Sequence, residues 1–340
     1  MKFLVIGLGS MGKRRVRNLI ALGYKEQTIG FDPRIDRTNE AKEYGIEVFN
    51  NYDEAMLKHK FGAFLISTPP NFHMKYAYDA AKSNISCFIE ASVVDADKVL
   101  ELSKSIEGKN ILMAPSCTMR YYSGPIKIKE LIKNNIIGKV LNFNYHTGQY
   151  LPDWHPWEDI KDFYVSNPDT GAAREIVPFE LTWLNDIFGD SLPLACVRRK
   201  LTDMSANIDD IYHCLLEYPN NILGNVTVEV ISRPKAVREF RVMGSEGEIV
   251  FSGDTNSVKY INIHMDKWKT ISFEEGTVEN GYINPEEPYI NEVKDFVDSV
   301  KLIFNGESSI YPNTLEDDYK ILQTLYKLED ISEERDDLSR

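Results

Sequence analysis

Short apolar runs alternate with segments of helical periodicity over the first third of the chain. The runs predict strands at 3–6, 28–31, 47–49, 63–66, 87–90 and 111–113. Helices are predicted between them, and those over 11–22 and 37–44 each end before a glycine, which suits the left-handed position after a last helical turn. Strands that alternate with helices indicate a parallel sheet with right-handed crossovers.

The pattern changes after about residue 116. A helix is predicted over 125–135, because Pro125 is favoured at the first helical position. Strands then follow one another at 140–146, 194–201, 211–218, 223–231, 240–244, 248–251, 258–263 and 270–273, before two final helices at 289–304 and 315–328. Such a run predicts a mostly antiparallel open sheet. We therefore expect a first α/β domain over 1–117 and a second, α+β domain over 118–340, whose final helices can pack back on the first.

The first predicted strand runs into GLGSMG at residues 7–12 and then into a helix. A second strand that ends in an acid completes the fingerprint of a Rossmann dinucleotide-binding domain. Gly7 permits the tight turn, Gly9 lets the backbone approach a pyrophosphate, and Gly12 lets the helix pack closely on the strand. The alternative is a Rossmann-like domain that has lost its ligand. The cofactor contacts expected in this loop are Gly7, Gly9, Ser10, Met11 and Gly12.

The acid at the end of the second strand distinguishes two cofactors. Asp32 lies where a carboxylate accepts both hydroxyls of the adenosine ribose and repels a 2′-phosphate, so we expect NAD rather than NADP. Arg34 follows two residues later and can swing toward a 2′-phosphate, which would relax this preference.

The ends of the next strands also carry polar candidates, since ligands of such sheets bind outside the carboxyl ends of the strands. Thr68 and Asn71 can hydrogen-bond a cofactor ribose, although Asn71 is equally a candidate helix cap and His73 a candidate surface histidine. Glu90 ends the fifth strand, where a carboxylate is costly unless it serves a ligand or a partner. The cofactor candidates here are Ser67, Thr68, Pro69, Asn71, His73 and Glu90.

Charge and composition exclude some classes of function. The net charge of −13 argues against nucleic acid or an anionic membrane as the main partner. No apolar run reaches spanning length, and basic residues follow the first strand where a signal peptide would have its cleavage site, so we expect a cytoplasmic protein. The four cysteines lack any CxxC spacing, which favours buried, reduced thiols and no metal site.

These motifs resemble the glucose-fructose oxidoreductase, inositol dehydrogenase and MocA-type (Gfo/Idh/MocA) oxidoreductase family. The resemblance covers nearly the whole chain and rests on GLGSMG at 7–12, FDPR at 31–34, STPPNFH at 67–73, Glu90, MRYYSGP at 119–125 and GKV at 138–140. It implies NAD as the cofactor. It also implies a second-domain sheet whose open face packs against another subunit, hence a homodimer or homotetramer.

Two positions depart from the family pattern. The family usually has Glu-Lys-Pro where this chain has EAS at 90–92, and that lysine commonly acts near the substrate hydroxyl and the nicotinamide. Ala91 cannot do so. Many members also carry Asp and His four residues apart on a helix that faces the nicotinamide, whereas the stretch 171–184 places Glu175 and Phe179 there. Two usual acid–base groups are therefore missing.

An aromatic loop over 148–164 supplies candidates for the missing groups. Long aromatic loops are more often functional than idle, although this one could simply cover the domain junction. Trp154 and Trp157 can stack on a sugar ring or a base, and His155 belongs to the residue type best suited to proton transfer near neutral pH. The predicted catalytic residues are His155, Glu175 and Tyr121, and the predicted substrate contacts are Arg120, Trp154, Trp157 and Arg174.

Several of these candidates have structural alternatives. Arg174 and Arg120 offer planar forks that fit a carboxylate or phosphate. Glu175 lies in a first helical turn, where the helix dipole favours an acid that has no catalytic role. Tyr121 needs a neighbouring cation in order to ionise, and Arg120 is adjacent to it in sequence.

Hydride transfer at a sugar hydroxyl needs a group that takes or delivers the hydroxyl proton. We therefore expect an NAD-dependent oxidoreductase acting on a sugar or nucleotide sugar. The pairing of DWHPWED with REIVPFE resembles members associated with bacterial surface-sugar pathways. Two alternatives remain: a non-redox enzyme that epimerises or eliminates while retaining NAD, and a catalytically silent sensor of NAD or a nucleotide sugar, motivated by Ala91 and Phe179.

Overall fold

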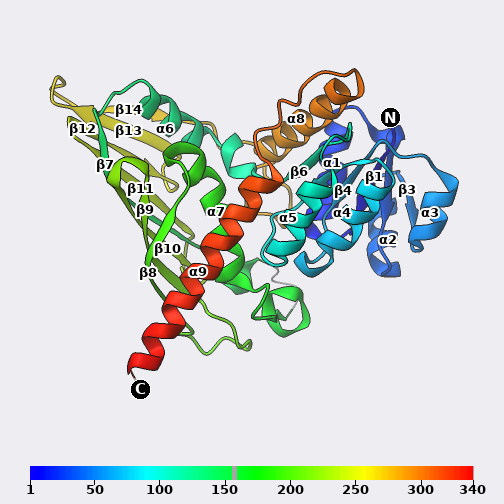
Figure 1. The fold of residues 1–340 in the computed structure, drawn as a ribbon, viewed down its shortest axis with the longest axis horizontal. Coiled ribbons are helices and arrows are strands. Elements are labelled where there is room, and N and C mark those ends of the chain that lie inside the picture. Colours follow the sequence, from blue (N-terminus) through cyan, green and yellow to red (C-terminus); the bar gives the residue numbers. More distant parts are fainter. Residues whose placement is uncertain (155–158, 340) are drawn as a thin grey trace. The chain divides into compact units, whose positions relative to one another are not determined.

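The computed structural model describes residues 1–154 and 159–339 and divides into two compact units. The first unit comprises Met1–Thr118 and Asn284–Tyr319, and the second comprises Met119–Ile283 and the chain from Lys320 onward. Figure 1 follows the chain through both. None of the described helices is long and apolar enough to cross a membrane.

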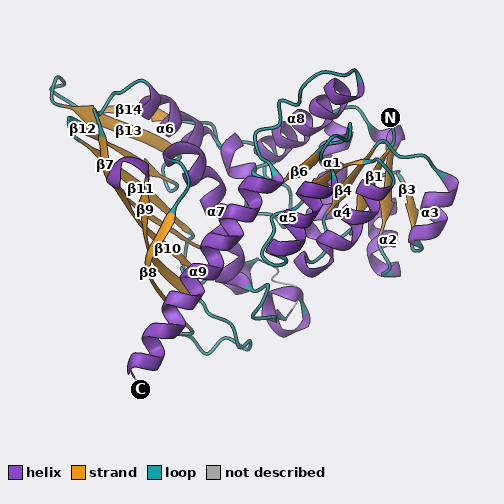
Figure 2. Ribbon diagram, in the orientation of Figure 1, coloured by secondary structure: helices purple, strands orange, loops and turns teal. Residues whose placement is uncertain are grey.

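The first unit is built on a six-stranded parallel sheet (Figures 1 and 2). Its strands are β1 (Phe3–Ile6), β2 (Thr28–Phe31), β3 (Glu47–Phe49), β4 (Ala63–Ile66), β5 (Ser86–Ile89) and β6 (Met113–Pro115). They lie in the order β3-β2-β1-β4-β5-β6, and every neighbouring pair is parallel. The chain turns back at β1, so a ligand of such a sheet binds outside the carboxyl ends of β1 and β4. The predicted Rossmann architecture is confirmed.

Helices cover this sheet because each presents small and apolar side chains to it. They are α1 (Ser10–Ala21), α2 (Ile35–Lys42), α3 (Tyr52–Lys58), α4 (His73–Lys82), α5 (Ala96–Ser105), α8 (Glu287–Phe304) and the first residues of α9 (Leu315–Ser339), with short turns η1 (Lys25–Gln27) and η2 (Pro70–Phe72). In α1 the buried residues include Val16 and Leu19, and the central strands β1, β2, β4 and β5 are buried throughout.

Proline places two strands at sheet edges. The sixth strand was expected at 111–113, but β6 runs over Met113–Pro115. Pro115 has no N–H to donate, and an edge strand needs hydrogen bonds on one side alone. The same reason accounts for Pro193 in β8, the edge strand of the second sheet. That strand begins two residues earlier than expected and carries a register shift between Pro193 and Ala195.

The second unit contains an eight-stranded sheet in the order β14-β13-β12-β11-β7-β10-β9-β8. Its strands are β7 (Val140–Gly148), β8 (Leu192–Arg199), β9 (Ile211–Tyr218), β10 (Ile222–Glu229), β11 (Val237–Gly244), β12 (Gly247–Ser252), β13 (Ser257–Asn262) and β14 (Lys269–Ser272). The β7–β10 pair is parallel and the other six pairings are antiparallel. The prediction of a mostly antiparallel sheet is confirmed.

Helices of the second unit are α6 (Ser123–Lys133), α7 (Ala172–Phe188) and the remainder of α9, with short turns η3 (Thr118–Tyr121), η4 (Leu151–Asp153), η5 (Ile160–Asp162), η6 (Tyr164–Ser166) and η7 (Pro219–Asn221).

Alternate residues of the central strands are buried. Phe143 and Tyr145 of β7 lie on the buried face, whereas Leu223 of β10 and Leu215 of β9 are 45% and 39% exposed on the opposite face. One face of this sheet therefore remains open in the single chain.

A buried acid fixes α7 to the sheet. Glu180 accepts hydrogen bonds from the Tyr145 hydroxyl and from the Trp183 indole, each at 2.7 Å, and its carboxylate pairs with Arg238 at 2.9 Å. Burial alone would lower the pKa of Arg238, but the Glu180 charge outweighs it and raises that pKa. A charge that is fully buried is tolerated because its hydrogen bonds and its counter-ion are in place.

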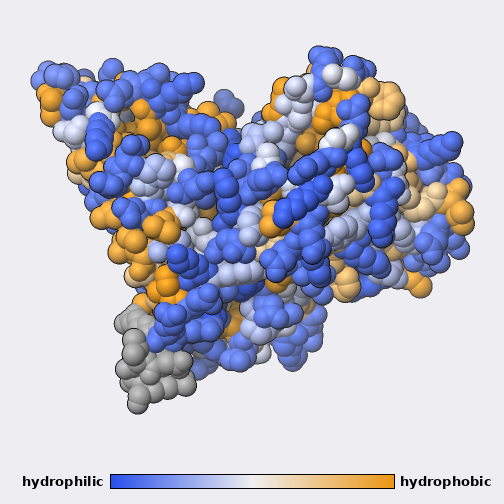
Figure 3. Space-filling view, in the orientation of Figure 1, coloured by the Kyte–Doolittle hydropathy of each residue, from blue (hydrophilic) through white to orange (hydrophobic). Residues whose placement is uncertain are grey.

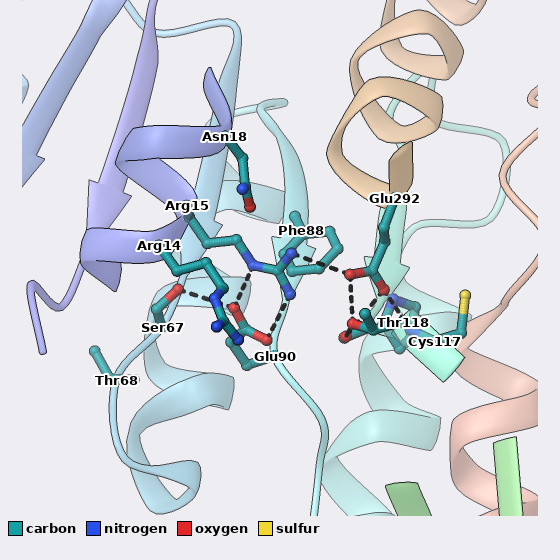
Figure 4. Close-up of polar contacts among 12 residues, drawn as sticks. Arg14, Arg15, Asn18, Ser67, Thr68, Phe88, Glu90, Cys117, Thr118 and Glu292 are labelled. Atoms are coloured by element: carbon teal, nitrogen blue, oxygen red, sulfur yellow. Dashed lines mark hydrogen bonds and ion pairs between the residues drawn. The ribbon is translucent and has the colours of Figure 1, made fainter. Parts of the chain in front are cut away.

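A second buried charge network lies in the first unit (Figure 4). The guanidinium of Arg15 on α1 donates two hydrogen bonds to Glu90, at 2.6 and 2.9 Å, and lies 3.0 Å from a carboxylate oxygen of Glu292 on α8. Glu292 also accepts hydrogen bonds from the backbone N–H of Cys117 and the hydroxyl of Thr118, both at 2.6 Å. Burial raises the pKa of Glu292, and the Glu90 charge adds to that effect.

Replacing Arg15 by methionine is expected to be strongly destabilising, because it leaves two carboxylates without their cation. Loss of one partner of a buried pair costs about 3–5 kcal/mol of unfolding free energy. The matched control is Lys13→Met, which breaks the partly exposed pair with Glu40 and should cost less than about 1 kcal/mol. Urea denaturation measures both. Equal, small losses for the two variants would contradict the role given to Arg15.

Candidate cofactor site

The glycine loop has the tight geometry that its sequence predicts. Gly7 has a φ of 87°, in the left-handed region, and its amide donates to the Phe31 carbonyl at 2.8 Å. A Cβ on Gly7 would lie 2.7 Å from the carbonyl oxygen of Ser67, and a Cβ on Gly12 would overlap the carbonyl oxygen of Gly7. The loop, the start of α1 and the residue after β4 therefore touch through bare backbone. This is the close packing that a dinucleotide loop requires.

Asp32 is buried directly beside this loop. It is 6% exposed, and its carboxylate accepts the backbone N–H of Leu8 at 2.7 Å and that of Arg34 at 2.9 Å. The two amides fix the carboxylate at the end of β2, next to the glycines. Each oxygen retains a lone pair, so the same carboxylate can still accept a ribose hydroxyl.

Arg34 points to a different partner. Its guanidinium donates to Asp36 at 2.6 and 3.2 Å in an exposed pair. An exposed pair of this kind contributes little to stability, so it leaves Arg34 able to move. The prediction that Arg34 can reach a 2′-phosphate stays a prediction.

The segment after β4 contains two buried polar atoms for which the described residues supply no hydrogen-bond partner. His73 is 2% exposed, so the alternative of a surface histidine is wrong. Its Nε2–H donates to the Thr68 carbonyl at 2.9 Å in the neutral tautomer, and burial lowers its pKa, which favours that neutral form. This leaves the Nδ1 lone pair of His73 and the Oγ1 hydroxyl of Thr68 without partners in the described chain.

Asn71 lies in the short turn η2 and is exposed. Neither η2 nor α4 has a side-chain cap: the capping positions are Pro69 and Phe72. The alternative in which Asn71 caps the next helix is therefore not what the structure shows, and its amide remains available to a ligand.

The Glu90 carboxylate is paired with Arg15 of the same unit. Besides the two hydrogen bonds from Arg15, it accepts the Ser67 hydroxyl at 3.2 Å (Figure 4). The sequence offered either a ligand or a partner as the reason for a carboxylate at this strand end, and the structure supplies the partner. A direct contact of Glu90 with the cofactor stays a prediction.

The residues that follow Glu90 are Ala91 and Ser92. Ala91 is half-buried, and Ser92 is buried beside the carboxyl of Asp318, in the first turn of α9. Burial raises the pKa of Asp318 to about 6, against an opposing effect of the Ser92 hydroxyl. The described residues give the Oδ2 atom of Asp318 no hydrogen-bond partner.

The predicted catalytic and substrate residues belong to the second unit. Arg120 in η3 donates to the Thr182 carbonyl at 3.0 Å and lies 3.6 Å from Asp186, both on α7. Arg174 pairs with Glu329 of α9 at 2.6 Å. Both guanidinium groups therefore hold helices in place, and these contacts give no support to an anion-binding role.

Glu175 opens α7 and accepts a hydrogen bond from the Tyr164 hydroxyl at 2.9 Å. Tyr121 and Trp154 are half-buried, and the described residues leave the indole N–H of Trp154 without a partner. His155 and Trp157 lie outside the described residues, so their predicted roles stay predictions.

The geometry of the first unit is that of a Rossmann dinucleotide-binding domain. Residues 1–110 match the oxidoreductase family with an NAD-binding Rossmann fold, and residues 126–250 match the GFO/IDH/MocA C-terminal domain. The two matches follow in order and together take in most of the chain. The chain belongs to the Gfo/Idh/MocA oxidoreductase family, and its first unit is the NAD-binding Rossmann domain.

Two relatives show how far the sequence likeness extends. A D-xylose 1-dehydrogenase (NADP(+)) from Hypocrea jecorina is 27% identical over 254 residues, which are 68% of this chain and 62% of that protein. An uncharacterized oxidoreductase from Streptococcus pneumoniae is 26% identical over 143 residues, 42% of this chain and 38% of that protein. The chain therefore matches less than two thirds of the length of either relative.

Solved structures share the fold over almost the full length. An oxidoreductase from Agrobacterium radiobacter in complex with NAD+, L-tartaric acid and magnesium gives a TM-score of 0.82 at 12% identity, covering 98% of this chain and 96% of that one. Levoglucosan dehydrogenase in complex with NADH and levoglucosan gives a TM-score of 0.81 at 16% identity, and the match covers 98% of this chain and 97% of that one. An inositol dehydrogenase homolog from Azotobacter vinelandii in complex with NAD+ gives a TM-score of 0.81 at 13% identity, and the match covers 98% of this chain and 95% of that one. At such identities the likeness shows the fold alone.

Three observations in the first unit fit a dinucleotide. The glycines of the loop have no room for a Cβ, the Asp32 carboxylate is fixed beside the loop, and Thr68 and His73 present polar atoms without a partner among the described residues at the next strand end. The residues that sequence reasoning missed are Arg15, Glu292 and Asp318. The one available signal was the basic run after GLGSMG, which suggested a charged helix without showing its partners.

Replacing Asp318 by asparagine should change the pH dependence of stability. Its folded pKa of about 6 is above the value for an unfolded chain, so the folded state binds this proton more tightly. That stabilisation is fully present below about pH 4 and is lost as pH rises through 6. A shift of about two pKa units at about 1.4 kcal/mol each makes the variant roughly 3 kcal/mol more stable than wild type at pH 8, and the difference should fall toward zero near pH 4.

Urea denaturation at several pH values measures this difference. The exposed Asp330→Asn, also on α9, is the control and should track the wild type at every pH. A stability difference for Asp318→Asn that does not vary with pH would show that its effect comes from packing and not from the proton.

Proposed function

We propose that the protein is an NAD-dependent oxidoreductase that transfers hydride to or from the hydroxyl-bearing carbon of a sugar or nucleotide sugar. The observation that carries this proposal is the buried Asp32 carboxylate, held by the Leu8 amide beside an intact glycine loop. The names of a relative, a D-xylose 1-dehydrogenase, and of two structural neighbours, a levoglucosan dehydrogenase and an inositol dehydrogenase homolog, support a polyhydroxylated substrate. A role in surface-sugar biosynthesis and a cytoplasmic location are part of the same proposal.

NAD is the proposed cofactor in preference to NADP. A 2′-phosphate would have to approach the Asp32 carboxylate, and both of the backbone amides near that carboxylate already donate to it. Both cofactors occur among similar proteins, since the D-xylose 1-dehydrogenase is named for NADP(+) and the levoglucosan dehydrogenase structure contains NADH.

Hydride acceptance or donation is the chemistry that the bound nicotinamide supplies. The chain has to supply the proton transfer, and Ala91 cannot. We propose Glu175, His155 and Tyr121 for this task, with Glu175 favoured because its carboxylate accepts a hydrogen bond from the Tyr164 hydroxyl. That contact orients the carboxylate, whose remaining lone pairs can accept the proton of a substrate hydroxyl. Trp154 and Trp157 are proposed to stack on the substrate.

A second candidate is an NAD-retaining protein without net redox turnover, either an epimerising or eliminating enzyme or a silent sensor. Ala91 and Phe179 favour it, since neither side chain can take a proton at the positions where the family usually has a lysine and a histidine. Native mass spectrometry of protein purified without added ligand identifies any retained NAD(H) or nucleotide sugar. Retained NAD with no NADH formed from any sugar would support this candidate over hydride transfer to solution.

The variant Asp32→Asn tests the cofactor assignment. It removes the charge while keeping an oxygen that can accept the Leu8 amide. We expect NADH affinity to fall about 10-fold and NADPH affinity to rise, because hydrogen bonds to the charged carboxylate are lost and its repulsion of a 2′-phosphate disappears. Fluorescence titration measures both constants. Glu43→Gln, an exposed acid after α2, should leave them unchanged.

An unchanged NADH to NADPH ratio would contradict the role given to Asp32. A wild type that binds neither nucleotide would refute the proposed function itself. Turnover is assayed in parallel by NADH absorbance with a panel of free sugars and nucleotide sugars, and we expect activity with at least one of them.

We also propose that a second copy of the chain covers the open face of the second-unit sheet. Its outward positions include four large apolar side chains, each between 38% and 48% exposed: Leu192, Leu215, Leu223 and Met243. Figure 3 shows apolar surface over the strands that Figure 1 labels β8 and β9. Asn142 and Glu217 alternate with three of these side chains across the sheet. Burial against a second copy would remove the apolar side chains from water.

Placing a charge on this face should separate the copies. We expect Leu223→Glu to convert the protein to a monomer by size-exclusion chromatography with light scattering, because the new carboxylate would be buried without a partner. The control is Leu57→Glu on α3, a position that is 88% exposed and belongs to the first unit. A variant of Leu223 that keeps the wild-type mass would contradict this interface.

A further inference from the structure

Arg37 of α2 lies against the glycine loop. A Cβ built on Gly9 would overlap Nη1 of Arg37, so the guanidinium lies directly over the second glycine of the fingerprint. Gly9 is the residue whose bare backbone allows a pyrophosphate to approach. A cation is therefore positioned at the point where the loop is expected to meet phosphate.

The acids nearest to Arg37 on α2 are already paired with other residues. Asp36 accepts Arg34 at 2.6 Å, and Glu40 accepts Lys13 at 2.6 Å. In the described chain the guanidinium of Arg37 takes part in no ion pair and no side-chain hydrogen bond, although the residue is half-buried. A half-buried guanidinium that has no counter-ion within the described chain is expected to bind an anionic ligand.

The basic run at the start of α1 offers no competing cation, because each of its members binds an acid of this chain. Arg14 and Arg17 both pair with Glu286 at 2.9 Å. Arg15 pairs with Glu90 and Glu292, and Lys13 with Glu40. None of these side chains is left over for a phosphate.

We propose that Arg37 binds the pyrophosphate of the dinucleotide and moves off Gly9 to do so. The inference rests on the proposed function, since it names one contact within that cofactor site. Arginine suits the task because its planar fork can donate two parallel hydrogen bonds to phosphate oxygens. A pyrophosphate is favoured over a 2′-phosphate because Arg37 lies over Gly9, whereas the ribose end of the site is marked by Asp32.

Titration of four ligands tests the contact. NADH and NADPH contain the pyrophosphate, ADP has adenosine with a diphosphate but no nicotinamide riboside, and adenosine has no phosphate. Arg37→Ala should weaken NADH, NADPH and ADP by about 10- to 100-fold and leave adenosine within about 2-fold of wild type, as expected for loss of charge-assisted hydrogen bonds. Arg37→Lys, which keeps the charge without the fork, should lose less.

Lys42→Ala is the matched control, because it removes an exposed cation from the same helix and should leave all four affinities within about 2-fold. The salt dependence of NADH affinity gives a readout that a purely structural role would not change. It should become shallower in Arg37→Ala, since one phosphate contact is lost, and stay as in wild type in Lys42→Ala. Circular dichroism melting confirms that each variant folds.

The titration results distinguish a failure of the Arg37 inference from a failure of the proposed function. Unchanged affinity for ADP and NADH in Arg37→Ala overturns the inference while the proposed function stands. A loss confined to NADPH also overturns it and assigns Arg37 to the 2′-phosphate instead. A folded wild type that binds none of the nucleotides overturns the proposed function, and the inference with it.

Discussion

The cofactor unit depends on one buried cation. Arg15 belongs to the helix that begins in the glycine loop, yet its counter-ions come from the end of β5 and from α8 far along the chain. Glu292 in turn accepts the Cys117 amide and the Thr118 hydroxyl, at the last residues of the first segment of this unit. A single guanidinium thus joins the loop that is proposed to hold phosphate, the strand end that follows it, and the helix that completes the unit.

This arrangement also explains the distribution of charge around the glycine loop. A chain with net charge −13 places four basic residues directly after GLGSMG, which from sequence alone suggests attraction of phosphate. The structure shows that Lys13, Arg14, Arg15 and Arg17 neutralise acids of the chain itself. Among the residues that the structure describes around the loop, Arg37 of the next helix is a cation without an acid partner.

Local features could be predicted from the sequence, and pairings between distant residues could not. The strands of the Rossmann sheet, the turn at Gly7 and the position of Asp32 follow from apolar periodicity and from a conformation that glycine alone adopts readily. His73 was open to a surface interpretation because its burial depends on how α4 packs, which a spacing rule does not contain. Glu90 posed the same difficulty, since the sequence demanded a partner for it but could not show that Arg15 is that partner.

The departures at Ala91 and Phe179 have a further physical consequence. Without a lysine after Glu90, the end of β5 offers a carboxylate already bound to Arg15 and no group that can exchange a proton with a substrate hydroxyl. The residues proposed above for proton transfer, Glu175, His155 and Tyr121, all belong to the second unit by chain position. There the Glu175 carboxylate and the Tyr164 hydroxyl already share a hydrogen bond, at the start of the helix that Glu180 fixes to its sheet. Glu175 thus lies on a helix that a buried acid anchors, and its hydrogen bond to Tyr164 of η6 limits the motion of its carboxylate. A fixed orientation of this kind is what a proton-transfer group needs.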